Sequence, residues 1–420
     1  MERFEEWGAA AKKNYICGIR TGFAMTETGK KKDQILKTLA TLISEQEAAI
    51  LSANAEDLKA YDGADESMYD RLKVGPEKVK AMADACLETA AMEDPVGRQL
   101  YDFDHPNGMR VVNQTVPFGK ILIIYESRPD VTIEAAATAF KAGNQIWLKG
   151  GKEALRTNTL LAKLWHQALE AEGMDTGFVN YLTLDRSATQ ELIKENPYRF
   201  DLIIPRGGER LIAFVREHSN IPVIVSGRGN NFLYVGASAD YDMALSIIKN
   251  GKSRISVCNA LDKVLIDRAW PELEDKLQRL AGALSEAGLE VILDQNGWVG
   301  IHNATQPVPE AMWYEEFLSH RIVLKVVDSM EIGMDLINKY SGGHSATIVT
   351  EDQEEVRAFM AEADCAAVYH NASTRFTDGG QLGMGAEIAI STQKLHARGP
   401  ISVSQLVSNK WMVYGNGQIR

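Results

Sequence analysis

One cysteine of the chain stands in a setting that favours nucleophilic chemistry. Cys258 lies in the short polar segment Ser253-Arg254-Ile255-Ser256-Val257-Cys258-Asn259-Ala260, after a predicted helix and before the apolar run LDKVLID. A thiolate is the nucleophile that covalent acyl transfer requires, and both Arg254 and a helix beginning just after the loop would stabilise it. The alternative is a buried, inert cysteine, which we favour for Cys17, Cys86 and Cys365.

Two glycine-bearing turns follow predicted strands. One contains Lys149, Gly150 and Gly151, and the other contains Arg206, Gly207 and Gly208. Turns from a strand into a helix form the usual ligand crevice of a parallel sheet, where glycines let backbone N–H groups approach a phosphate. Lys149 is placed to reach an adenosine ribose or its 2′-phosphate. Because no full GxGxxG pattern is present, we expect a variant nucleotide site, although each turn alone is a weak signal.

Small polar residues and glycines gather near the C-terminus. They fill the run from Asn371 to Gly380 and much of the run from Gly385 to Pro400. A long segment with few apolar residues is usually functional or mobile. Its hydroxyl groups and Arg375 are candidates for holding an amino acid or a phosphate.

The order of the predicted elements is that of an α/β protein. The first 95 or so residues have helical periodicity, and an expected hairpin follows with YDFD and MRVVNQTV around a Pro-Asn-Gly turn. From residue 119 to about 230, strands such as GKILIIYE, DLIIPRGG and IPVIVSG alternate with helices, which predicts a parallel sheet covered on both faces. A second such array begins at NFLYVGAS. The C-terminal VSNKWMVYG is a strand without a sequential partner, which we expect to pair with the hairpin or with another subunit.

The bulk composition excludes several classes of protein. The 420 residues carry a net charge of -12, which would repel a nucleic acid or an anionic membrane. The four cysteines form no CxxC pair and no zinc-ligand spacing, so neither a disulfide framework nor a metal site is expected. No signal peptide and no apolar run of about 18 residues is present. We expect a cytoplasmic protein of two or three domains that acts on a small molecule.

Five segments of the chain together form a recognisable pattern. They are IIYESRPDVTIEAA (123–136), DLIIPRGG (201–208), VCNA (257–260), LKVVDS (324–329) and NASTRFTDGGQLGMGAEIAISTQKLHARGP (371–400). With these segments the chain resembles the gamma-glutamyl phosphate reductase family of the aldehyde dehydrogenase superfamily, over nearly its whole length. The resemblance implies an α/β fold of two three-layer αβα parallel-sheet domains plus a small β oligomerisation element. The expected cofactor domain spans 1–97, 117–232 and part of 386–400, the catalytic domain 233–385, and the oligomerisation strands 98–116 and 401–420.

The resemblance also assigns roles to residues. Cys258 matches the nucleophile, while Asn259 and Ser127 are expected to stabilise the oxyanion. The two glycine turns match the cofactor site, and Glu316 matches the glutamate that contacts the nicotinamide ribose. Substrate ligands are expected at Arg128, Ser373, Thr374, Arg375 and Arg398.

The implied reaction is the NADPH-dependent reduction of L-glutamyl 5-phosphate to glutamate 5-semialdehyde and phosphate, a step of proline biosynthesis that passes through a Cys258 thioester. The resemblance further implies a homodimer or homotetramer and a transient contact with glutamate 5-kinase. No metal is implied.

Three positions depart from the family's usual pattern. Val225-Ser226-Gly227 stands where Glu or Thr followed by Gly is common, Asn231-Phe232 replaces Cys-His, and Ser253-Arg254-Ile255 is shorter than Thr-Gln-Arg-Pro. Val225 cannot act as a base that activates water, which favours reduction of an activated acyl group. The altered loop leaves a related acyl-phosphate or acyl-CoA reductase as an alternative. A catalytically silent binding protein is a further alternative, against which the intact run 371–400 argues.

Overall fold

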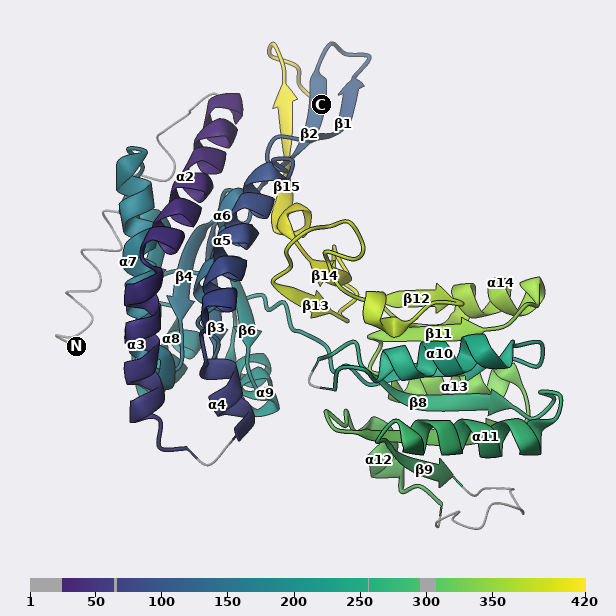
Figure 1. Cartoon of the computed structure of the whole chain (residues 1–420). Helices are drawn as coiled ribbons and strands as arrows, with labels where there is room; N and C mark the ends of the chain where they lie inside the picture. The colour runs from purple at the N-terminus through teal and green to yellow at the C-terminus, as the bar shows by residue number, and fades with distance from the viewer. Residues whose placement is uncertain (1–24, 64–65, 256, 295–306) are drawn as a thin grey trace. The chain divides into compact units, whose positions relative to one another are not determined.

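The computed structural model describes residues 25–63, 66–255, 257–294 and 307–420. The chain forms two compact units, of which the first contains residues up to 225 together with 384–389 and 401–420. The second contains 226–383 and 390–400. Both units have helices on the two faces of a sheet (Figure 1), so the expected α/β fold class with parallel sheets is present.

The described part of the first unit is built on a four-stranded parallel sheet of order β5-β4-β3-β6. Residues Leu122 and Ile124 of the central strand pack against two helices on one face, because alternate side chains of a strand point to opposite faces. Ile121 and Ile123 are fully buried toward the other helices. The strands are β3 (Lys120–Tyr125), β4 (Gln145–Lys149), β5 (Val179–Tyr181) and β6 (Leu202–Arg206).

Helices cover both faces of this sheet. The pair that packs on Leu122 and Ile124 is α8 (Arg186–Glu195) and α9 (Glu209–His218). Pro76 at the first position of α5 suits a helix start, since the missing N–H has no partner there. The remaining helices are α2 (Met25–Glu45), α3 (Glu47–Ala60), α4 (Glu66–Leu72), α5 (Pro76–Ala91), α6 (Val131–Lys141) and α7 (Leu155–Ala171).

The second unit carries a six-stranded parallel sheet of order β12-β11-β7-β8-β10-β9 within the described residues. Its strands alternate their side chains between two apolar cores, so that Leu233 packs with α10 and α11 while Phe232 packs with α13 and α14. The strands are β7 (Asn231–Val235), β8 (Leu261–Asp267), β9 (Glu290–Asp294), β10 (Arg321–Val327), β11 (Ser345–Val349) and β12 (Ala367–His370). The helices are α10 (Tyr241–Gly251), α11 (Leu273–Glu286), α12 (Glu310–Tyr314), α13 (Met330–Tyr340) and α14 (Gln353–Glu362).

A separate antiparallel sheet belongs to the first unit. The expected hairpin forms strands β1 (Gln99–Asp104) and β2 (Arg110–Pro117). The C-terminal strand β15 (Val407–Tyr414) pairs with β2. The strand that had no sequential partner therefore pairs with the hairpin of its own chain. Two short strands, β13 (Ala389–Ser391) and β14 (Gly399–Ile401), form another small sheet.

Two local expectations differ from the structure. The run 221–227 was expected to be a strand, but it contributes only two isolated bridges, one between Val223 and Ile203 and one between Ser226 and Ser391. The segment after Cys258 is strand β8 and not a helix, so no helix N-terminus follows the cysteine. The proposed stabilisation of the thiolate by a helix dipole at this position is therefore wrong.

The unit boundaries agree with the expected ones only in part. Residues 386–389 belong to the first unit, as expected for part of 386–400, but residues 226–232 belong to the second unit, although the resemblance placed them in the cofactor domain. The physical reason is that β7 begins at Asn231 and pairs with β8 and β11. The side chain of Arg398 likewise bonds to Asp364 of the second unit.

Candidate active site

Cys258 lies in a turn of residues 257–260, called the Cys258 turn, which leads into strand β8. Cys258 is partly exposed, whereas Cys86 and Cys365 are buried in the apolar cores. Burial raises the pKa of both buried thiols, that of Cys365 to about 11, so neither is a ready nucleophile. Cys17 lies outside the described residues.

A neighbouring side chain holds this turn by its backbone. Asn231 Nδ2 donates to the carbonyl oxygens of Cys258 and Ala260, each at 2.7 Å. Gly229 lies against the same place, since a Cβ there would clash with the Cys258 carbonyl oxygen. The turn thus rests on the segment that leads into β7.

The C-terminal polar run packs on the same turn. Asn259 is buried, and its Nδ2 donates to the carbonyl oxygens of Arg375 and Thr377 at 3.1 and 3.0 Å. Thr374 Oγ1 donates to the Asn259 carbonyl oxygen at 3.0 Å, and Ser373 Oγ accepts from the Arg375 N–H at 3.3 Å. Residues more than 110 positions apart in the sequence therefore form one cluster around the cysteine.

A guanidinium group, that of Arg375, interacts with the cysteine. Arg375 donates to the side-chain oxygen of Asn259. Burial lowers the pKa of Arg375, and the nearby Arg254 lowers this pKa further, whereas Asp378 and Cys258 oppose the change. Arg375 therefore interacts electrostatically with both Arg254 and Cys258. This is the positive surrounding that favours a thiolate and that suits a negatively charged acyl substrate.

Glu316 lies in the segment 313–317, called the Glu316 segment, and its carboxylate contacts the backbone of Gly229. Burial raises the pKa of Glu316, and a hydrogen bond from the Gly229 N–H opposes that rise. Because Gly229 also touches the Cys258 carbonyl oxygen, Glu316 and the cysteine turn meet the same residue.

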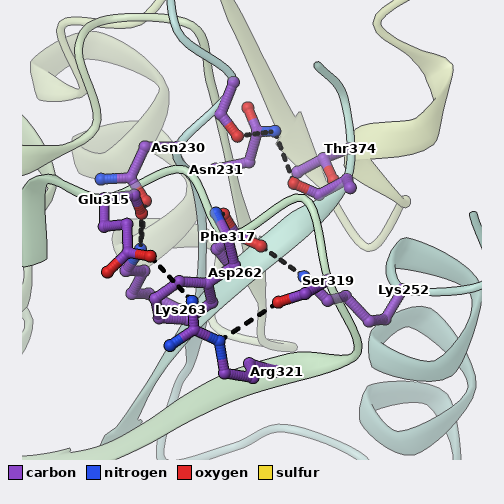
Figure 2. A network of polar contacts seen from close by, with 12 residues as sticks. Asn230, Asn231, Lys252, Asp262, Lys263, Glu315, Phe317, Ser319, Arg321 and Thr374 are labelled. Atoms are coloured by element: carbon purple, nitrogen blue, oxygen red, sulfur yellow. Dashed lines mark hydrogen bonds and ion pairs between the residues drawn. The ribbon is translucent and has the colours of Figure 1, made fainter. Parts of the chain in front are cut away.

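A buried polar network anchors the Glu316 segment (Figure 2). Lys263, fully buried on β8, donates to Asn230 Oδ1 at 2.6 Å and to the Glu315 carbonyl oxygen. Its Nζ also lies 3.9 Å from the centre of the Phe317 ring. Burial lowers the pKa of Lys263 to about 8.

Two further residues complete this network. Asn230 Nδ2 donates to the carbonyl oxygens of Trp313 and Tyr340 at 2.6 and 2.7 Å. Asp262 pairs with the buried Lys252 and accepts from the Phe317 N–H at 2.8 Å. Each end of the Glu316 segment is thereby fixed by buried hydrogen bonds, which makes its position well defined.

In the first unit, three cations stand near the carboxyl ends of adjacent strands. Lys149 ends β4, Arg206 ends β6, and Arg128 follows the end of β3. Burial raises the pKa of Glu134 to about 7, and Arg206 and Arg128 oppose the rise, so both arginines face one carboxyl group. Cations gathered at this edge of a parallel sheet suit the phosphates of a nucleotide.

The helix N-termini beside these turns are occupied by carboxylates of the chain itself. The Gly208 N–H, just before α9, donates to Glu126 Oε2 at 2.7 Å. Asp57 of α3 accepts from the Arg156 and Thr157 N–H groups at the start of α7, at 3.2 and 2.8 Å. The fit to a nucleotide therefore rests on cationic side chains rather than on the helix N-termini that the sequence favoured.

Three of the turn glycines lie close to side chains of the chain itself. A Cβ on Gly207 would lie 2.5 Å from Glu126 Oε2. A Cβ on Gly150 would clash with Asn158, and one on Gly151 with Glu153. Lys149 Nζ donates to the Gly150 carbonyl oxygen at 2.6 Å, and burial lowers the pKa of Lys149.

Comparison with known proteins identifies the family. Residues 21–295 match the family described as "Aldehyde dehydrogenase family". The chain belongs to the aldehyde dehydrogenase family. Within it, the chain is 42% identical over 397 residues to Gamma-glutamyl phosphate reductase 2 of Bacillus licheniformis, covering 94% of this chain and 93% of the relative. It is also 42% identical over 392 residues to Gamma-glutamyl phosphate reductase of Gloeobacter violaceus, covering 93% of each.

Solved structures agree with this assignment. The crystal structure of Gamma-glutamyl phosphate reductase from Thermotoga maritima matches with a TM-score of 0.91 at 35% identity and covers 99% of both chains. An acetylating aldehyde dehydrogenase from Geobacillus thermoglucosidasius shares the fold, with a TM-score of 0.69, 18% identity and coverage of 100% and 98%. The resemblance stated from the sequence and the expected fold class are confirmed.

Some expected ligands of the family site have partners within the chain. Ser127 has a positive φ of 46°, and its N–H and hydroxyl donate to Glu153 Oε1 at 2.8 and 2.7 Å. Arg398 donates to the Asp364 carboxylate and to its carbonyl oxygen, each at 2.8 Å. Their roles at the oxyanion and the substrate stay predictions.

The sequence did not single out the residues that fix the site in place. Asn230, Lys263 and Glu126 act through contacts with residues 33 to 110 positions away in the chain. The sequence indicated Asn231 in one way only, because it replaces the family's usual cysteine. That difference pointed to the position but did not predict that the amide would bind the Cys258 turn.

In the described part of the chain, no helix is both long enough and apolar enough to cross a membrane.

Proposed function

We propose that the chain reduces L-glutamyl 5-phosphate to L-glutamate 5-semialdehyde and phosphate, with NADPH as the reductant, in proline biosynthesis. The observation that carries the proposal is the partly exposed Cys258, which interacts electrostatically with Arg375, in a chain 42% identical over most of its length to proteins named for this reaction. The name of those relatives supplies the substrate, and the site supplies a matching nucleophile.

The covalent steps take place at the sulfur. Cys258 thiolate attacks the acyl carbon, the C–O bond to phosphate breaks, and a thioester forms with release of phosphate. The cofactor, when bound, supplies the hydride. The resulting alkoxide re-forms the carbonyl as the C–S bond breaks, which releases the aldehyde and regenerates the thiolate. The Asn259 N–H, in the same turn, is the proposed donor to the oxyanion, and such a donor contributes about 3 kcal/mol.

The remaining residues are proposed to bind and orient the substrate and the cofactor. Arg375, which interacts electrostatically with both Cys258 and Arg254, is proposed to pair with an anionic group of the substrate, and Arg254 is a second candidate for this role. Ser373, Thr374 and Arg398 shape the surroundings of this pocket, and Arg128 is a further proposed substrate ligand. Lys149 and Arg206 are proposed to hold the cofactor phosphates, with Glu316 on the ribose beside the nicotinamide ring.

The proposal is tested in the reverse direction. Glutamate 5-semialdehyde, NADP and inorganic phosphate are mixed with the purified chain, and NADPH formation is followed by absorbance. Cys258→Ala should lose about 100-fold or more in kcat. Cys365→Ala is the matched control and should keep its activity, because Cys365 is buried beside Ser341. A folded parent protein that forms no phosphate-dependent NADPH removes the proposed substrate.

A second candidate is a reductase of the same fold that acts on another acyl phosphate or an acyl-CoA. The observation that favours it is Asn231 in place of the family's usual cysteine, because this residue contacts the nucleophile turn directly. Oxidation of an aldehyde with coenzyme A, independent of phosphate, would support this candidate over the first.

Assembly and location are part of the same proposal. The sheet of β1, β2 and β15 exposes large apolar side chains, among them Tyr101, Phe103, Trp411 and Val413. Such a surface suits a homodimer or homotetramer. We further propose a cytoplasmic enzyme that receives its unstable substrate through transient contact with glutamate 5-kinase. Light scattering of the purified chain measures the oligomer size.

A further inference from the structure

The side-chain amide of Asn231 has two different surroundings. Its Nδ2 faces carbonyl oxygens, those of Cys258 and Ala260 at 2.7 Å and that of Gly229 at 3.0 Å. Its Oδ1 accepts from the Ser345 hydroxyl at 2.6 Å and lies 2.9 Å from His344 Nδ1. Because hydroxyl and ring donors surround the oxygen and carbonyls surround the nitrogen, one orientation of the amide satisfies all these contacts.

His344 strengthens that orientation. The imidazole is fully buried, and burial lowers the pKa of His344 to about 4, so the ring is neutral at pH 7. With Asn231 Oδ1 as the acceptor, His344 Nδ1 carries the proton. The amide of Asn231 is therefore locked between the 344–345 segment on one side and the Cys258 turn on the other.

The strand pairing is irregular at this point. Asn231 stands opposite Leu261, but Phe232 stands opposite Lys263, so the register between β7 and β8 shifts by one residue. Such bulges re-aim side chains and often occur next to active sites. Here the irregularity lies where the Cys258 turn enters β8, and the Asn231 amide reaches the carbonyls on both sides of Asn259.

The residues just before Asn231 contact the other half of the site. The Gly229 N–H bonds to the Glu316 carboxylate, and Asn230 holds the Trp313 and Tyr340 carbonyl oxygens. Three consecutive residues, 229–231, are thus bonded both to the Glu316 segment and to the Cys258 turn. All of these residues belong to the second unit.

We propose that Asn231 is a positioning residue whose Nδ2 group fixes the direction of the Cys258 turn relative to Glu316. It acts through the backbone of the turn and touches neither substrate nor cofactor. The proposal rests on the proposed function in that Cys258 is taken as the nucleophile. Because the amide braces the nucleophile and not the cofactor turns of the first unit, its loss should lower kcat more than it raises the KM for the nucleotide.

The test compares Asn231→Ala with Ser345→Ala in the full chain. Both variants remove a buried hydrogen bond of the same amide, but Ser345→Ala leaves the Nδ2 contacts in place. Hydrogen–deuterium exchange of the 257–261 segment should be about tenfold faster in Asn231→Ala and within about threefold of the parent in Ser345→Ala. The kcat of Asn231→Ala should fall about tenfold or more with the nucleotide KM within about threefold.

Asn231→Asp is the second variant, used when Asn231→Ala does not fold. It keeps the shape and the Oδ1 contacts but lacks the N–H donors toward the turn, so it should also speed exchange of the 257–261 segment. Unchanged exchange in a folded Asn231 variant overturns the proposal, as does faster exchange with an unchanged kcat in an active protein.

The positioning role of Asn231 can be tested even if the proposed function is wrong. If the parent shows no reductase activity, the rate of Cys258 alkylation by iodoacetamide replaces kcat as the readout. An alkylation rate that changes at least about threefold in Asn231→Ala but not in Ser345→Ala supports the positioning role whatever the substrate. Equal rates in the parent and both variants overturn it.

Discussion

Replacing Lys263 by methionine should change how the stability of the second unit depends on pH. The folded-state pKa of Lys263 is about 8, against an ordinary 10.5, because burial disfavours the ammonium. The unfolded chain therefore binds more protons than the folded chain between these two values, and the free energy of unfolding rises with pH across that range. From pH 7.5 to pH 9.5 the gain attributable to Lys263 is about 2 kcal/mol.

Lys263→Met also removes two hydrogen bonds. Asn230 Oδ1 and the Glu315 carbonyl oxygen lose their Lys263 donor, and each loss costs about 1–3 kcal/mol. The removal of a buried ammonium offsets part of this cost at pH 7.5. As pH rises, the parent gains stability and the variant does not, so the variant's deficit should widen by about 2 kcal/mol at pH 9.5.

Urea unfolding of parent and variant, followed by tryptophan fluorescence, measures this difference at pH 7.5, 8.5 and 9.5. Trp313 lies within the network, because its carbonyl oxygen is bonded to Asn230. Groups that titrate equally in both proteins cancel in the subtraction. A difference that stays flat over this range would refute the reasoning, since it would mean that Lys263 keeps an ordinary pKa in the folded protein.

Three further predictions follow from single contacts. The pKa of His344 is lowered to about 4, so protonation opposes folding, and the parent should lose on the order of 3 kcal/mol as pH falls from 6.5 to 4, a loss absent from His344→Gln in urea titrations. Glu126→Gln removes a negative charge from the Gly208 N–H and should tighten NADPH binding several-fold by fluorescence titration; weaker binding would argue against that turn as a phosphate site. Gly229→Ala should abolish most activity while the nucleotide still binds, because its Cβ would clash with the Cys258 carbonyl oxygen.

Much of the fold could be predicted because it follows from local patterns. The run 121–125 is continuously apolar and buried, as a strand covered on both faces must be, and it forms most of β3, a central strand of the first sheet. The Pro-Asn-Gly turn correctly located the hairpin. The run 221–227 was predicted as a strand on the same grounds, but it makes only two isolated bridges, at Val223 and at Ser226.

The candidate site was only partly predictable. Cys258 and Arg375 could be chosen from residue type, and the structure brings them into one cluster. The carboxylates that bind the helix N-termini could not be predicted, because they come from distant parts of the sequence. Asp57, for example, accepts a hydrogen bond from the Thr157 N–H, 100 residues away. Likewise, nothing local distinguishes a cysteine before a strand from one before a helix. The positive charge near Cys258 was attributed to Arg254 and to a helix, but the helix is absent, and the structure shows Arg375 interacting with the cysteine.

The pairing of β15 with β2 joins Trp411 to Asn113 across nearly 300 residues. During synthesis, the ribosome must complete the entire second unit before this last strand emerges. Until then β2 has an open edge, and the Asn144 amide lacks the Leu406 carbonyl oxygen that it binds at 2.9 Å in the finished protein. The first unit therefore starts folding early but closes last, and β2 keeps an edge open to other chains until β15 is available.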